Sequence, residues 1–142
     1  MRNITEITAL WECPKCGRQF EKRNQSHSCK QYPLEQHFIG KINGELLYKK
    51  LKLMLENTMD SFKIESLACC IHFVSTFTFA AVKVFKDKIS IDFSLNHKVI
   101  NKRIKQITPM SKNRFLHCID VFTETEINAE LVGWIREAHD KN

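Results

Sequence analysis

Three cysteines and a histidine lie close together in the first thirty residues, and they are the ligand types that zinc prefers. Cys13 and Cys16 form a Cys-x-x-Cys knuckle in "CPKCG", where a proline and a glycine favour a tight turn. His27 and Cys29 follow in "QSHSC". Thiolate and imidazole donors at this spacing suit one tetrahedral zinc ion. The segment therefore predicts a zinc site made by Cys13, Cys16, His27 and Cys29.

The identity of the fourth ligand stays open at this point. His27 and Cys29 are separated by a single residue, and if His27 faces away, His37 is the nearest replacement. The alternative to a metal site is a set of reduced cysteines or disulfides between them. A site with four protein ligands has no open position for water, so the expected role of zinc is structural. The ion would fold a segment that is too short to build its own core.

The same segment resembles half of a DNA-reading zinc finger. The match fails after the knuckle, because ten residues separate Cys16 from His27 and no second histidine follows at helical spacing. We therefore expect no base-specific readout by this unit. Three nearby cations could still contact phosphate groups: Arg18, Lys22 and Arg23.

Positive charge is concentrated in one part of the chain. The formal net charge is +6; residues 83–114 carry nine Lys and Arg against two Asp, whereas residues 115–142 carry two against six acidic residues. Such a surplus attracts phosphate-bearing partners through counterion release. The alternative is a solvated lysine surface of the kind that many proteins have, since the lysines form no tight cluster.

A second set of residues has the chemistry of an anion-binding cleft. Arg103 and Arg114 could supply charge, and His117 could complete a pocket for a small anionic ligand. Period-two counting, however, places His117 on the same strand face as Phe115 and Ile119, which favours a hydrogen-bonded core histidine. Both interpretations remain open from sequence alone.

Other reactive side chains give weaker signals. Cys69 and Cys70 are adjacent, so in a strand their side chains point to opposite faces, and we expect them to fill the core rather than share a metal. His72 alternates with Cys70 and indicates nothing more specific. Asp92 and Asp120 are far apart in the sequence and cannot be paired from it.

Hydrophobic spacing predicts two helices around a run of strands. Asn43 is expected to cap the first helix, and a capping box of Thr123 and Glu126 to start the last. Alternating or β-branched residues between them predict strands over residues 65–74, 77–85, 88–95, 103–110 and 114–122, the fourth ending at Pro109. This order predicts an α+β fold, with an antiparallel sheet of about five strands packed by two main helices. We expect a zinc-binding leader over residues 1–33 and the α+β domain over residues 34–142.

Several classes of protein are disfavoured. The chain has no nucleotide-binding glycine loop, no serine nucleophile elbow and no HExxH metalloprotease motif. Its apolar runs are too short to cross a bilayer, and the first residues lack a secretory pattern. We therefore expect a cytoplasmic protein, in which close cysteines bind metal more often than they form disulfides.

Four stretches carry a resemblance to a known family: "LWECPKCGRQFEKRNQSHSCKQYPLEQHFIGK", "FAAV", "RIKQITPMSKNRFLHCIDV" and "ELVGWIREAH". The chain resembles the bacterial domain of unknown function numbered 5655, in the form with a Cys-rich leader. Arg114 and His117 match a family pattern of an arginine followed by two histidines, whereas Cys118 replaces the second histidine. The resemblance implies zinc and an α+β domain, and it implies no established activity.

The function expected from these features is a small zinc-stabilised binding module. Its expected partner is rich in phosphate, nucleic acid first, and is contacted by the leader cations and by residues 98–114. One alternative is a small-molecule sensor or enzyme whose pocket uses Arg103, Arg114 and His117. Another is an accessory module that binds a protein partner. Catalysis is the less expected outcome, and no catalytic residue is predicted.

Overall fold

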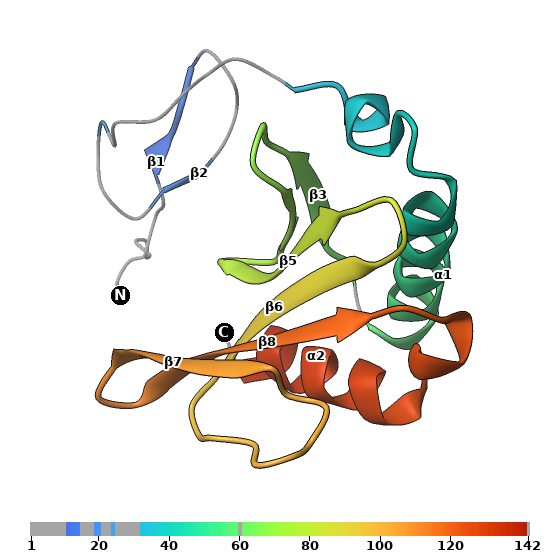
Figure 1. Ribbon diagram of the computed structural model, residues 1–142. Coiled ribbons are helices and arrows are strands. Elements are labelled where there is room, and N and C mark those ends of the chain that lie inside the picture. Colours follow the sequence, from blue (N-terminus) through green and yellow to red (C-terminus); the bar gives the residue numbers. More distant parts are fainter. Residues whose placement is uncertain (1–10, 15–18, 21–23, 25–31, 60, 142) are drawn as a thin grey trace. The chain divides into compact units, whose positions relative to one another are not determined.

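The computed structural model describes residues 11–14, 19–20, 24, 32–59 and 61–141. The chain divides into two compact units, residues 1–31 and residues 32–142. In the first unit, β1 (Trp11–Glu12) pairs antiparallel with β2 (Gln19–Phe20). The second unit holds the helices and the main sheet (Figure 1).

The second unit is built on a six-stranded antiparallel sheet in the order β3-β4-β5-β6-β8-β7. β3 to β6 follow one another as hairpins, whereas β8 lies between β6 and β7, so the chain crosses to the far edge before it returns. The strands are β3 (Lys63–Ser66), β4 (Ile71–Val74), β5 (Thr78–Val84), β6 (Ile89–Leu95), β7 (Gln106–Ser111) and β8 (Arg114–Val121). The predicted α+β class with an antiparallel sheet and two main helices is confirmed.

Both long helices, α1 (Ile42–Thr58) and α2 (Ala129–Lys141), lie on one face of the sheet (Figure 1). Two short 3-10 helices, η1 (Leu34–Phe38) and η2 (Glu124–Glu126), precede them. The core forms where one stripe of each helix meets alternate strand residues. Its largest members include Tyr48, Leu51, Phe73, Phe79, Phe93, Ile119 and Leu131. The spacing of apolar residues in both helices and in β6 predicted this buried face.

One expected strand is a hairpin in the structure. Residues 65–74 contain the end of β3, a turn and β4, and the turn is closed by mutual backbone hydrogen bonds between Leu67 and Cys70 of 2.9 and 3.3 Å. The sheet therefore gains a sixth strand. The predicted end of a strand at Pro109 is also wrong, because β7 continues to Ser111. β7 is an edge strand, where the missing proline N–H leaves no neighbour unpaired.

The helix starts differ from the expected ones. Asn43 lies inside α1, which follows Lys41 with no side-chain cap, so the predicted cap is wrong. The capping box of Thr123 and Glu126 is present, but it closes only η2. α2 is capped instead by Asn128, whose Oδ1 accepts the Leu131 N–H at 3.1 Å. η2 and α2 are therefore two separate helices, and each has its own N-terminal cap.

Candidate functional site

The sheet face opposite the helices, here called the outer face, carries several polar and reactive side chains. One row of directly paired residues runs across it, from β3 through β8: Glu65, His72, Ala81, Asp92 and Cys118. Because side chains alternate along a strand, their neighbours in each strand point into the core. The outer face is thus the part of the domain where chemistry could be displayed.

Two cysteines and a histidine meet at the end of this face where β3 turns into β4. The sulfur atoms of Cys69 and Cys70 lie 2.7 Å apart, and their sulfurs and a His72 ring nitrogen all lie within 4.8 Å of one another. Cys69 is exposed, whereas Cys70 is buried. The pKa of Cys70 is raised to about 12, mainly by burial and secondly by the adjacent Cys69 thiol. The expectation that the two sulfurs point to opposite faces is wrong, because Cys69 lies in the turn and not in a strand.

Two carboxylates that the sequence could not pair share the outer face. Asp92 lies opposite Cys118, and Asp120 lies opposite Ser90 two residues further along the same strand pair. Lys88 and Lys105 both reach Asp120 Oδ2, at 3.0 and 3.1 Å. Partial burial acts to raise the pKa of Asp120, but the hydrogen bonds from both lysines outweigh it and hold the pKa below its ordinary value. The arrangement is that of a structural ion pair at neutral pH.

His117 is a core residue. Its side chain is fully buried and its ring stacks on Phe93, with 5.3 Å between the ring centroids and 3° between the planes. Nε2 accepts the Val99 N–H at 2.9 Å, and Nδ1 lies 3.1 Å from the Phe115 carbonyl oxygen, to which it donates. Burial is the largest effect on the ring and lowers the pKa of His117. The core interpretation of this histidine is the one that the geometry supports.

Arg103 and Arg114 are held away from His117. Arg103 hydrogen-bonds to residues around the start of α2. One guanidinium nitrogen donates to Glu130 Oε1 at 2.9 Å, and the other donates to the Glu126 carbonyl oxygen at 2.6 Å. Arg114 donates to Ser94 Oγ at 3.2 Å. By strand alternation, Arg114 lies on the outer face of β8 and His117 on the inner face. The contacts that the structure gives for Arg103, Arg114 and His117 therefore lie apart, and a pocket that uses all three stays a prediction.

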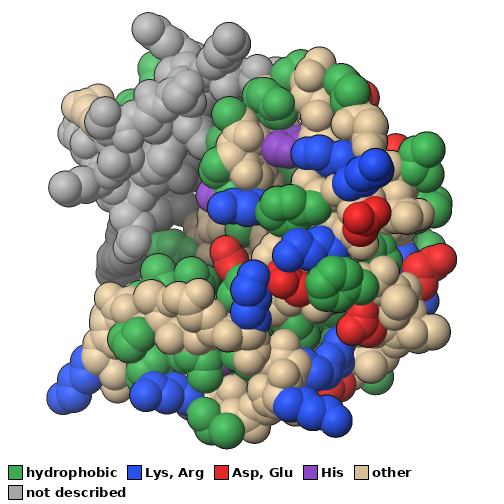
Figure 2. Space-filling model, in the orientation of Figure 1, with side chains coloured by type: hydrophobic (Ala, Val, Ile, Leu, Met, Phe, Trp, Pro, Cys, Tyr) green, Lys and Arg blue, Asp and Glu red, His purple; other side chains and the backbone are tan. Residues whose placement is uncertain are grey.

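The segment 98–114 presents its cations at one edge of the domain. Lys and Arg side chains lie along the lower edge in Figure 2, where Figure 1 draws the β7–β8 hairpin and the loop before it. Among the described residues, Arg103 pairs with Glu130 and Lys105 pairs with Asp120. In the part of the chain that the structure describes, Lys98, Lys102 and Lys112 are exposed and have no ion-pair partner.

Most of the predicted leader residues lie outside the described residues, namely Cys16, Arg18, Lys22, Arg23, His27 and Cys29. Cys13 is described and is buried directly after β1. His37, the alternative ligand, lies in η1, and its Nε2 is 3.0 Å from Ser66 Oγ. Burial lowers the pKa of His37. The zinc ligand set therefore stays a prediction.

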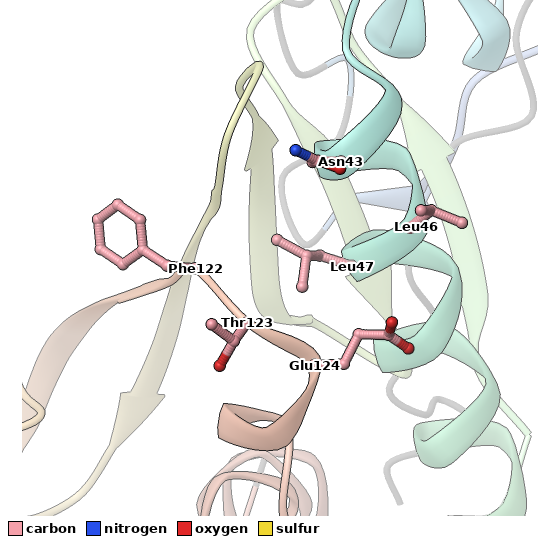
Figure 3. A pocket seen from close by; sticks show the side chains of 6 residues that line it. All are labelled: Asn43, Leu46, Leu47, Phe122, Thr123 and Glu124. Atoms are coloured by element: carbon pink, nitrogen blue, oxygen red, sulfur yellow. The ribbon is translucent and has the colours of Figure 1, made fainter.

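A small hollow lies between the first turns of α1 and the segment after β8 (Figure 3). Its volume is about 240 Å³, below the ~300–1,000 Å³ that is usual for ligand pockets. It is lined by Asn43, Leu46, Leu47, Phe122, Thr123 and Glu124. With a single carboxylate and no histidine or cysteine, this lining offers no acid–base pair and no metal site.

The fold and these surfaces define a small α+β domain with a helix-covered inner face and a polar outer face. The sequence pattern of the family described as "Domain of unknown function (DUF5655)" matches residues 36–142. The chain belongs to this family, as the resemblance in its motifs indicated. No curated protein and no solved structure matches the chain. Among the described residues, no helix is long and apolar enough to cross a membrane.

Proposed function

We propose that the chain is a zinc-stabilised binding module for a phosphate-rich partner, nucleic acid first. The observation that carries this proposal is the set of cations in residues 98–114, a segment with six Lys and Arg and no carboxylate. Cations that already pair with carboxylates have little left to offer a phosphate. Lys98, Lys102 and Lys112 are exposed and have no such partner among the described residues, so they are the residues that we assign to phosphate contact.

Apolar side chains beside these lysines suit a nucleic acid better than a free phosphate ion. Ile100 is 85% exposed and Met110 is 58% exposed. Such side chains can pack against sugars and bases once lysines have neutralised the backbone. Lys98 Nζ also lies 5.4 Å from the centre of the Phe115 ring, a cation–π contact. The leader residues Arg18, Lys22 and Arg23 are a second set of cations that we assign to phosphate contact.

Replacing Lys98, Lys102 and Lys112 together with glutamine is expected to weaken oligonucleotide binding and to flatten its salt dependence. Each lost phosphate contact removes about 0.9 from the slope of log K against log salt on duplex DNA, and about 0.7 on a single strand. The triple variant should therefore lower the slope by roughly two to three. Fluorescence anisotropy of labelled single-stranded and duplex oligonucleotides, measured at several salt concentrations, gives both slopes.

The matched control removes the same charge elsewhere on the domain. Lys49 and Lys52 lie on α1, where they pair with Glu45 and Glu56, and Lys63 is exposed on β3. Replacing these three lysines with glutamine should leave the salt slope near that of the wild type. Absence of binding by the wild type at low salt, or an equal loss in the control, contradicts the proposal.

The zinc site in the leader is the second part of the proposal. β1 and β2 flank residues 13–18, so the Cys-x-x-Cys segment connects two paired strands, and Cys13 is buried. Replacing Cys13 and Cys16 together with serine is expected to remove one zinc ion per chain, measured by elemental analysis of the purified protein. The Cys118→Ser variant serves as control and should keep that ion. Equal zinc in the wild type and the double variant contradicts this ligand assignment.

A further inference from the structure

The β3–β4 hairpin brings two cysteines and a histidine close together. Leu67 and Cys70 close the turn with reciprocal backbone hydrogen bonds, which leaves Ala68 and Cys69 as the two loop residues. Strand alternation does not apply within such a loop, so adjacent side chains can lie on the same side. His72 lies on the outer face of β4, two residues after Cys70. The fold thus brings three donors from four consecutive residues to one place.

The donor atoms are close enough for one ion to reach all three. The two sulfurs lie 2.7 Å apart, and the three donors lie within 4.8 Å of one another. Around a tetrahedral zinc ion with Zn–S bonds of ~2.3 Å, two sulfurs stand ~3.7 Å apart. Binding would therefore move the sulfurs apart by about 1 Å, which rotation of the exposed Cys69 side chain can supply without a change in the backbone.

We propose that Cys69, Cys70 and His72 bind a thiophilic metal ion of the zinc type. Two sulfurs and an imidazole favour zinc, and they disfavour magnesium and calcium, which take oxygen ligands. Among the described residues, three ligands surround the proposed ion, and one further donor would complete a tetrahedral shell. Cys69, one of the three ligands, is exposed. This site is distinct in residues and in unit from the proposed leader site.

The test uses the full chain with Cys13→Ser and Cys16→Ser, which removes two of the proposed zinc ligands of the leader. Titration with Co²⁺ in the presence of a phosphine reductant should give one bound ion per chain and a thiolate-to-cobalt charge-transfer band. Excess Zn²⁺ should displace the cobalt and abolish the band. Further replacement by Cys69→Ser, Cys70→Ser and His72→Ala should abolish both the bound ion and the band.

The matched control is Cys118→Ser in the same background. This thiol lies in the same row of the outer face as His72 but outside the cluster, so its loss should leave the Co²⁺ titration unchanged. Circular dichroism shows whether each variant keeps its fold. If a variant unfolds, the single substitution Cys69→Ser, at the exposed ligand, replaces it and should weaken binding and reduce the band. No bound cobalt in the starting background, or the same titration after removal of the three ligands, overturns the proposal.

Discussion

Replacing Gly44 with alanine is expected to lower the free energy of unfolding by about 3 kcal/mol. Gly44 lies in the first turn of α1, where the helix meets the end of β5. A methyl group at this position would overlap the carbonyl oxygen of Phe85 and stand 2.7 Å from Val84 Cγ1. Backbone cannot rotate away as a side chain can, so α1 would have to shift from the sheet. Urea denaturation followed by circular dichroism measures the loss.

Gly133 provides the matched control for this prediction. It lies in α2, it is exposed, and a methyl group there would meet nothing within 4 Å. Alanine loses less conformational entropy than glycine when a helix forms, so Gly133→Ala should stabilise the domain by about 0.5–1 kcal/mol. Opposite signs for the same substitution would show that contact with β5, and not helix propensity, makes Gly44 necessary. Similar effects at both positions would contradict the close approach of α1.

The elements with a strong local pattern could be predicted from the sequence. β6 alternates strictly between apolar and polar residues, and its four apolar side chains, from Ile89 to Leu95, are buried as expected. The turn between β3 and β4 was missed because "LACC" contains no Gly, Pro, Asn or Asp, the residues that mark most turns. This one error also misplaced Cys69, because a residue in an assumed strand must alternate with its neighbour.

The positions of the other candidate residues depend on the order of the strands in the sheet. Strand alternation correctly placed His117 beside Ile119 on the buried face. Whether Arg103 and Arg114 reach it depends on the placement of β8 between β6 and β7, and on the loop that leads to β7. No local pattern encodes that order. The pairing of Lys88 and Lys105 with Asp120 has the same origin, since strand neighbours far apart in sequence meet only in the folded sheet.

Replacing His117 with alanine is expected to cost about 3 kcal/mol of stability. The substitution removes a ring stacked on Phe93 and leaves a cavity in the core. It also removes the acceptor of the partly buried Val99 N–H and the ring donor of the Phe115 carbonyl. His97 is the control, because it is exposed and pairs with Glu137 at the surface. His97→Ala should change the free energy of unfolding by less than about 1 kcal/mol.

The pH dependence of stability tests the same residue in a second way. Burial lowers the pKa of His117 in the folded state below the ~6.5 of an unfolded chain, so the unfolded state binds more protons in this range. The stabilising contribution of the neutral ring is therefore complete above about pH 6.5, and it is lost as the pH falls below that value. His37 shifts in the same direction, so His117→Ala should reduce the difference in stability between about pH 7.5 and about pH 5.5 without abolishing it. An unchanged difference would show that the pKa of His117 is the same in the folded and unfolded states, which contradicts the lowered value.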